Sequence, residues 1–259
     1  MGKNKNQVVA YQDITDNEVS FYKEQGYLVM PGFINTVYIK KLRDECFEVL
    51  EAEGISRQKL NNASETADKL RNTNIYYEDS CLDELINGER SLHIASRLIG
   101  GKAYRYFPFA VVKSAGGGGN FHFHQDNNYT QHEPAEGSLN IWVALVDVTP
   151  DNGCLQIVPG SHKKGVLDWE NAGDDDVHKK IKGEVSNPFP VRMHAGDAIA
   201  FSRLMVHGSG KNSGLEPRVA YALQYHREDV NYLDKETNEW KKLIELSNNR
   251  FHPEKRNKK

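Results

Sequence analysis

The sequence predicts a mainly β protein, a jelly roll flanked by N-terminal α-helices. Hydrophobic residues follow a helical period through residues 15–103. From about Tyr104 onwards, short runs of aromatic and β-branched residues alternate with Gly, Pro, Asn and Asp, which is typical of many short strands joined by turns. A chain of 259 residues is long enough for one sizeable core, so we expect a single domain over residues 1–259.

Three segments of the helical flank carry start and stop signals. Residues 15–26 (TDNEVSFYKEQG) open on a Thr-Asp pair suited to capping and close on Gly26. Residues 35–54 place apolar side chains at helical spacing before Gly54, and residues 91–100 also end on a glycine. We expect helices in these segments and peripheral tails at residues 1–14 and about 245–259.

The predicted jelly-roll core spans residues 104–228. Turn-forming residues separate its strand-like runs, as they do in sandwiches and barrels. The expected strands lie within residues 103–113, 120–126, 138–148, 154–160, 190–193, 197–202, 204–210 and 218–226.

Composition favours a globular protein of the reducing cytoplasm. The net charge is −3 and the sequence pI is near 6.4, so the chain lacks the basic character of nucleic-acid-binding proteins. Cys46, Cys81 and Cys154 form no CxxC pair, which argues against a disulfide framework or a thiolate zinc site. No apolar run approaches the length that spans a bilayer, and the N-terminus lacks the apolar stretch of a signal peptide. We expect no nucleic-acid or membrane partner, and a monomer or a homodimer.

The run of residues 121–126 (FHFHQD) raises the possibility of a metal site. Alternate residues of a strand share one face, so His122, His124 and Asp126 project together. Further along, His207 ends an apolar strand, and Arg218 begins the next one after a short turn. We expect these last two strands to pair as antiparallel neighbours, bringing Arg218 near His207, and the barrel to place His207 over the first histidine strand.

Two imidazoles and one carboxylate on one side of a metal leave the other coordination positions open. This arrangement is favoured by non-haem Fe(II) oxygenases, whose oxidant must coordinate directly. Arg218 adds a permanent planar cation, which can bind a carboxylate of a dicarboxylate cosubstrate through two parallel hydrogen bonds.

Three segments resemble the phytanoyl-CoA dioxygenase (PhyH) family of Fe(II)/2-oxoglutarate-dependent oxygenases. They are residues 124–126 (HQD), 140–163 (NIWVALVDVTPDNGCLQIVPGSHK) and 206–218 (VHGSGKNSGLEPR). The resemblance runs from Thr15 to Tyr225 and includes the opening FYKEQGYLVMPGFI. It implies a double-stranded β-helix, the cupin-like form of the jelly roll, behind N-terminal helices.

The resemblance also implies roles for individual residues. Iron would be bound by His124, Asp126 and His207, and the distal carboxylate of 2-oxoglutarate by Arg218, with the cosubstrate pocket completed by Ser209, Gln125 and Trp142. Substrate contacts are expected from His122, Asn128 and Phe109. One departure concerns a lysine that contacts the cosubstrate in the family from a region before the first core strands. Its candidates here are Lys69 and Arg71.

The implied reaction is the hydroxylation of an unactivated C–H bond of a small molecule, with O2 consumed and succinate and CO2 released. Halogenating relatives replace the carboxylate ligand by Ala or Gly, whereas this chain keeps Asp126. Desaturation, cyclisation and epimerisation stay open, as do a non-catalytic metabolite-binding sensor and a zinc hydrolase using the same ligands. The substrate class is also open among acyl-CoA esters, amino acids, phosphonates and natural-product intermediates.

Overall fold

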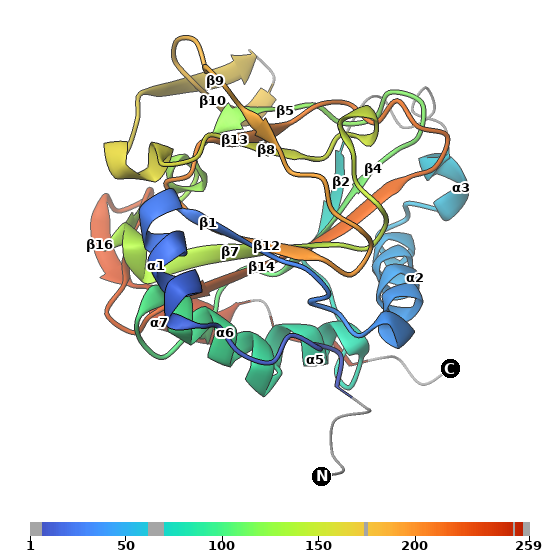
Figure 1. The fold of residues 1–259 in the computed structure, drawn as a ribbon, viewed down its shortest axis with the longest axis horizontal. Coiled ribbons are helices and arrows are strands. Elements are labelled where there is room, and N and C mark those ends of the chain that lie inside the picture. The colour runs from blue at the N-terminus through green and yellow to red at the C-terminus, as the bar shows by residue number, and fades with distance from the viewer. Residues whose placement is uncertain (1–6, 62–69, 174–175, 251, 256–259) are drawn as a thin grey trace.

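A computed structural model describes residues 7–61, 70–173, 176–250 and 252–255. Two antiparallel sheets face each other, and helices cover the outer side of the larger one (Figure 1). The larger sheet has the strand order β1 (Tyr27–Met30), β12 (Ala198–Ser202), β7 (Ser138–Ala144), β14 (Arg218–His226), β4 (Phe109–Lys113) and β2 (Leu70–Thr73), and β3 (Tyr104–Arg105) pairs with β14. The smaller has the order β11 (Phe189–Pro190), β8 (Leu155–Ile157), β13 (His207–Ser209) and β5 (Phe121–His124). The predicted jelly roll with N-terminal helices is confirmed.

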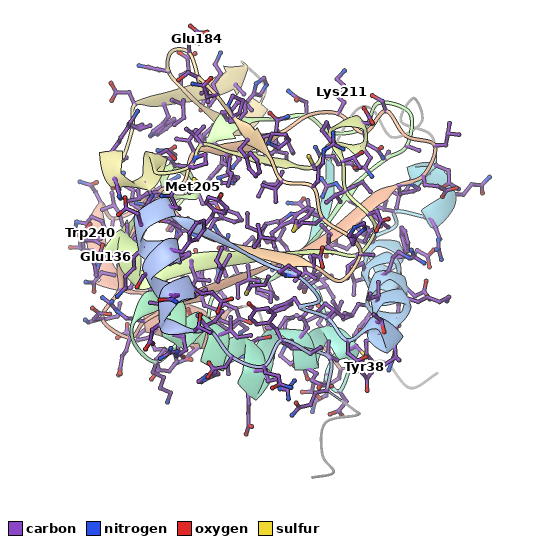
Figure 2. The ribbon with its side chains drawn as sticks, viewed as in Figure 1. Tyr38, Glu136, Glu184, Met205, Lys211 and Trp240 are labelled. Atoms are coloured by element: carbon purple, nitrogen blue, oxygen red, sulfur yellow. The ribbon has the colours of Figure 1, made fainter. Side chains whose placement is uncertain are left out.

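Alternation along the central strands divides the core into two layers. Ile141 and Val143 of β7 pack in the cluster that includes the helices, whereas Trp142 and Ala144 pack in the cluster between the sheets. All nine residues of β14 are buried, since both faces of this strand are covered. Side chains fill the layer between the large sheet and the helices (Figure 2). One face of the large sheet therefore packs against the helices, and the other face points toward the second sheet.

The three predicted helices are confirmed as α1 (Asp16–Gln25), α2 (Thr36–Ala52) and α6 (Glu89–Ile99). The Thr15 side chain accepts a hydrogen bond from the Glu18 amide, and the Glu18 carboxylate accepts one from the Thr15 amide, so a capping box starts α1. Gly26 ends α1 with a left-handed backbone at φ 79°, a conformation that glycine adopts without strain.

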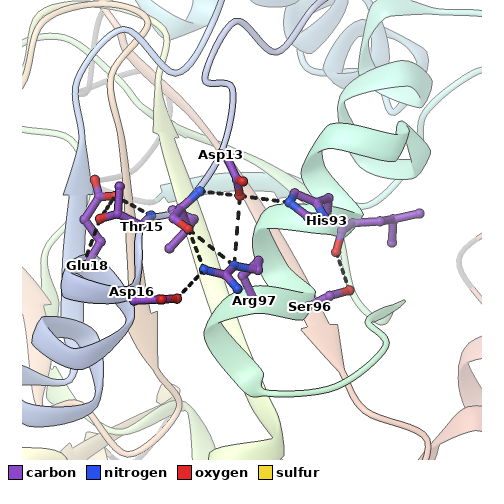
Figure 3. Close-up of polar contacts among 9 residues, drawn as sticks. Asp13, Thr15, Asp16, Glu18, His93, Ser96 and Arg97 are labelled. Carbon is purple, nitrogen blue, oxygen red and sulfur yellow. Dashed lines mark hydrogen bonds and ion pairs between the residues drawn. The ribbon is translucent and has the colours of Figure 1, made fainter.

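A polar network fastens the segment before α1 to α6 (Figure 3). Arg97 donates to the Ile14 carbonyl and to Asp16 Oδ1, each at 2.8 Å, and His93 Nε2 lies 2.9 Å from Asp13 Oδ1. The two acids are exposed, so these ion pairs add little free energy of folding. Their effect is to fix the path by which the N-terminal segment reaches the first helix.

The helical flank and the tails differ from the prediction. β1 and β2 lie within residues 15–103 but belong to the large sheet. The apolar run YLVM of β1 pairs with β12, and β2 pairs with β4. Val8 is fully buried and Val9 pairs with Ile34, so the described part of residues 1–14 is not a peripheral tail. At the other end, α7 (Leu243–Asn249) extends into the predicted tail of about 245–259, and its Ser247 is buried.

Several further elements had no clear signal in the sequence. They are α3 (Arg57–Leu60), α5 (Cys81–Asn87), β6 (His132–Glu133), β9 (Trp169–Gly173), β10 (Asp176–Ile181), β15 (Asn231–Asp234) and β16 (Glu239–Lys242). Short 3₁₀ helices span Asp126–Asn128, Ala135–Gly137, Pro150–Asn152 and Ser161–Lys164. Within the described ranges, no helix combines the length and the apolar character needed to cross a bilayer.

A buried carboxylate joins α2 to α5. Glu45 Oε1 accepts from the Cys81 amide at 3.1 Å, and Oε2 accepts from the Leu82 amide at 2.9 Å. These amides lie in the first turn of α5 and have no acceptor within that helix. The side chain of Glu45 therefore caps a helix that is distant in the sequence.

We predict that Glu45→Ala lowers the free energy of unfolding by about 1–3 kcal/mol, because two buried amides lose their acceptors. Urea denaturation measures the change. Glu51→Ala, on an exposed position of the same helix, serves as the control and should shift stability by less than about 0.5 kcal/mol. Equal effects of the two substitutions would contradict the capping role.

Two buried histidines make the fold sensitive to acid. His226 Nδ1 lies 2.7 Å from the Arg227 carbonyl and Nε2 lies 2.7 Å from Ser247 Oγ of α7, and burial lowers the pKa of His226 to about 4. Burial likewise holds the pKa of His132 well below its usual range. The unfolded chain binds these protons more readily than the folded protein. Unfolding is therefore favoured as the pH falls from about 6.5 towards 4.

We predict that His226 alone contributes about 1–2 kcal/mol to the stability lost between pH 7 and pH 5. His226→Gln should reduce that loss, as measured by urea unfolding at the two pH values. His194→Gln, at a position whose side chain is 89% exposed, should leave the loss unchanged. A His226→Gln variant that loses as much stability as the wild type would show that this histidine is not responsible.

Candidate metal and cosubstrate site

Two neighbouring strands bring the predicted ligands together. β5 and β13 are antiparallel, and His124 and His207 are paired residues in their register. Asp126 begins the short 3₁₀ helix two residues after the end of β5, and its Oδ1 lies 3.4 Å from His124 Nε2 and 3.6 Å from His207 Nε2. All three ligand atoms lie within 4.8 Å of one another, so a single ion can contact all of them. Two imidazole nitrogens and one carboxylate oxygen form the donor set expected for non-haem iron.

Hydrogen bonds orient each of these side chains. His124 Nδ1 lies 2.7 Å from the His122 carbonyl, and His207 Nδ1 lies 2.9 Å from the Met205 carbonyl. A backbone carbonyl can only accept, so each Nδ1 carries a hydrogen and each Nε2 is left to bind a metal. Asn140 Nδ2 donates to Asp126 Oδ2 at 2.5 Å, leaving Oδ1 facing the imidazoles.

The site holds its groups in the protonation states that a metal requires. Burial would raise the pKa of Asp126, but His207 and the hydrogen-bonded His124 hold it well below its usual range. Burial, together with the neighbouring His124, lowers the pKa of His207 to about 4. At neutral pH the carboxylate is therefore ionised and this imidazole is neutral.

Three neighbouring strands of the large sheet, β4, β14 and β7, form the wall of a cavity opposite the metal ligands. The polarity of this wall changes along the strands. Arg218 lies at one end, and Ala222, with its partners Phe109 and Trp142, forms an apolar layer further along. Gln224 is paired with Asn140 at the other end, beside Asp126. These residues and the triad of His124, Asp126 and His207 line one cavity, with walls also contributed by Val111, Phe121, Gly153, Leu155, Phe201, Gly208 and Ser209.

Arg218 is a buried cation with unused donors. It is 2% exposed, and its Nε and Nη1 have no hydrogen-bond partner among the described residues. Its guanidinium lies 5.2 Å from the centre of the Trp142 ring. Burial lowers the pKa of Arg218 to about 9, so it stays charged at neutral pH. A buried charge with free donors requires an anion, and a carboxylate has the matching geometry.

The predicted pairing between the strands of His207 and Arg218 is wrong. β13 lies in the small sheet between β8 and β5, whereas β14 lies in the large sheet between β7 and β4. The intervening loop crosses from one sheet to the other, and the Asn212 side chain pins it by donating to the Lys113 and Glu216 carbonyls. Arg218 and His207 consequently line the same cavity from opposite sheets.

Other predicted residues fall inside and outside this cavity. Ser209, Trp142 and Phe109 line it. Gln125 instead directs its amide away, donating to the Gly165 and Leu204 carbonyls. Lys69 lies outside the described residues, and of Arg71 only the backbone, in β2, is described.

The structure also separates His122 and Asn128 from the cavity. The His122 side chain is exposed because only its carbonyl faces inward, toward His124. Asn128 is buried, but its Oδ1 accepts from the Gln125 amide at 3.1 Å, which closes the turn that carries Asp126. Neither side chain lines the cavity.

Four polar residues of the site were missed in the sequence. Arg203 donates to the Asp126 and Thr130 carbonyls and to Gln224 Oε1. Asn140 and Gln224 form the amide end of the cavity, and Lys113 lies beside Arg218. The available signal was a polar residue within an otherwise apolar run, as with asparagine in SLNIWVA and arginine in AFSRLMV.

Known proteins resemble this sequence across most of the chain. The model of the family described as phytanoyl-CoA dioxygenase (PhyH) matches residues 22–220. L-proline trans-4-hydroxylase of Streptomyces griseoviridis is 28% identical over 233 residues, which cover 80% of this chain and 84% of that protein. Methylphosphonate hydroxylase of Gimesia maris is 26% identical over 218 residues, which cover 82% and 81%.

A solved structure shows the same fold. The non-haem α-ketoglutarate-dependent carbocyclase SnoK, from nogalamycin biosynthesis, superposes with a TM-score of 0.66 at 24% identity, covering 85% of this chain and 86% of that one. The family match, the donor set and the orphaned arginine agree with one another. The chain belongs to the phytanoyl-CoA dioxygenase family and is an Fe(II)- and 2-oxoglutarate-dependent dioxygenase.

Proposed function

We propose that His124, Asp126 and His207 bind Fe(II), and that Arg218 binds the distal carboxylate of 2-oxoglutarate. The observation that carries this proposal is a complete three-ligand set sharing one cavity with a buried arginine that lacks an anion. Ser209 and Trp142 complete the cosubstrate end. When bound, iron and 2-oxoglutarate supply, with O2, an oxidant able to break an unactivated C–H bond, and release succinate and CO2.

The residues of the chain supply position and environment. Asn140 holds Asp126 so that one oxygen faces the two imidazoles, and Arg203 fixes the backbone at the same point. The apolar layer of Phe109 and Ala222 lies between the cationic and the amide ends of the cavity. Such a layer excludes water from the reacting centre and strengthens the electrostatic interactions within it.

We infer that the main reaction is hydroxylation of a small molecule. Two relatives are named as hydroxylases, and the carboxylate ligand that halogenating enzymes lack is present as Asp126. A cavity lined by apolar and polar side chains from both sheets suits a small substrate. Its amide end carries Asn140 Oδ1, which has no partner among the described residues and can accept a hydrogen bond from substrate. Because a carbocyclase has the same fold, cyclisation is the second reaction for which product analysis should test.

We also propose that residues 1–259 form one oxygenase domain that acts in the cytoplasm as a monomer or homodimer. One hydrophobic cluster joins Val8 in the N-terminal segment to Tyr225 in β14, which supports a single domain. The three cysteines are buried and free, as expected in a reducing compartment. The net charge of −3 gives no attraction for nucleic acid.

We predict succinate formation that requires Fe(II), O2 and 2-oxoglutarate, and that falls more than about 100-fold in Asp126→Ala. Succinate is quantified during incubation with a panel of metabolites, and Fe(II) binding is measured in parallel by equilibrium dialysis. Asp44→Ala, in an exposed ion pair on α2, should keep full activity. Binding of iron and 2-oxoglutarate without oxygen consumption by any substrate would point to a sensor, and activity without oxygen to a hydrolase.

We predict that Arg218→Met raises the KM for 2-oxoglutarate by about 100-fold or more, because the distal carboxylate loses its charged partner in a buried site. Fe(II) affinity should stay near the wild-type value, since Arg218 is not a ligand. Arg192→Met, at an exposed position, is the matched control. An unchanged KM in Arg218→Met would place the cosubstrate elsewhere.

A further inference from the structure

A fully buried lysine stands beside the arginine of the cosubstrate site. Lys113 ends β4, is 0% exposed, and is paired in the register with Arg218 of β14. Its Nζ donates to Ser209 Oγ at 2.7 Å and also to the Gly210 carbonyl. Lysine is almost never fully buried without an acidic partner, yet both of these acceptors are uncharged. Arg218 at one end of the cavity and Lys113 next to it are therefore two buried basic side chains without an anionic partner among the described residues.

The amine lies immediately behind the cavity wall. Ser209 is half-buried and lines the cavity, whereas Lys113 is not among the lining residues. A side chain at Gly153 would bring its Cβ within 2.9 Å of Lys113 Nζ, so the glycine leaves room for the nitrogen. Because Lys113 donates to Ser209 Oγ, the hydroxyl hydrogen of Ser209 is free to donate to another acceptor.

We propose that Lys113 is a positioning residue for the cosubstrate, which holds Ser209 so that its hydroxyl donates to the distal carboxylate and adds positive charge behind it. The inference rests on the proposed 2-oxoglutarate site. Lys113 would act through Ser209 and through its charge, while Arg218 contacts the carboxylate directly. Its position on β4 also differs from that of Lys69 and Arg71, the two candidates from the family resemblance.

The groups around Lys113 couple the binding of the cosubstrate to the binding of a proton by this lysine. Burial, and then the charge of Arg218, lowers the pKa of Lys113 to about 6. The other titratable group acting on it is the Cys154 thiol, and the described side chains of the adjacent β2, Asn72 and Thr73, do not titrate. Above pH 6 the neutral amine has two N–H groups, which match its two acceptors.

A carboxylate bound at Arg218 favours the charged form of Lys113 and raises its pKa. The complex then binds more protons than the free protein at pH values just above 6. Cosubstrate binding is consequently accompanied by proton uptake, and the affinity falls as the pH rises through this range. A lysine with only a structural role would not produce this linkage.

Calorimetry of the Mn(II)-loaded protein tests the proposal. 2-Oxoglutarate is titrated at pH 7 in two buffers of different ionisation enthalpy, so that the heat difference gives the proton uptake. We expect uptake in the wild type, and in Lys113→Met its loss together with an affinity about 10-fold weaker. Lys211→Met removes an exposed lysine of the β13–β14 loop, at the outer edge of the molecule (Figure 2), and should behave as the wild type.

A second ligand separates positioning from a general defect. 2-Oxovalerate has the metal-binding end of 2-oxoglutarate but no distal carboxylate, so Lys113→Met should bind it as the wild type does. Absence of proton uptake in the wild type, or equal uptake in Lys113→Met, would overturn the role of Lys113. The wild-type measurement tests the proposal even if Lys113→Met does not fold. If the wild type failed to bind 2-oxoglutarate at all, the proposed cosubstrate site itself would be wrong.

Discussion

The pairing of β5 with β13 is the constraint on which the site depends. It places His124 opposite His207, although 82 residues separate them in the chain, and it leaves Asp126 at the strand end where its carboxylate reaches both imidazoles. Backbone carbonyls hold the two buried imidazoles in place, and Asn140 holds the partly buried carboxylate. The backbone of the small sheet thus prepares the donor set before any ligand binds, which is the usual condition for a precise metal site.

The large sheet makes the two ends of the cavity chemically different. Because β7 and β14 are buried on both faces, one set of alternate residues secures the helices while the other set faces the triad. Cationic, apolar and amide layers succeed one another along β14, from Arg218 through Ala222 to Gln224. Arg218 is the one arginine or lysine among the described residues that line the cavity, so we expect the distal carboxylate of 2-oxoglutarate at that end. We expect the substrate at the other end, where Asn140 and Gln224 line the cavity.

The cationic end is also where the protein is electrostatically incomplete. Arg218 and Lys113 are both buried, and the partners of the lysine are uncharged oxygens. Burying such groups costs free energy that an incoming anion recovers, so the site favours its ligand at the expense of its own stability. At the end of the cavity that holds the triad, the charge is compensated within the protein. There, the carboxylate of Asp126 is accompanied by two imidazoles and by Arg203, which donates to the Asp126 carbonyl.

The sequence alone determined the features that depend on neighbouring residues. The capping box at Thr15, the terminating Gly26 and Gly100, the alternating strands and the His-x-Asp pair are all set by contacts within a few residues of the chain. Only the tertiary structure decided the rest. It placed β1 and β2 in the sheet, separated the strands of His207 and Arg218, turned Gln125 and His122 away from the cavity, and buried Lys113 beside Arg218. These outcomes depend on which distant strands pair and on which charges become buried. Both are properties of packing between segments far apart in the chain, so no local pattern records them.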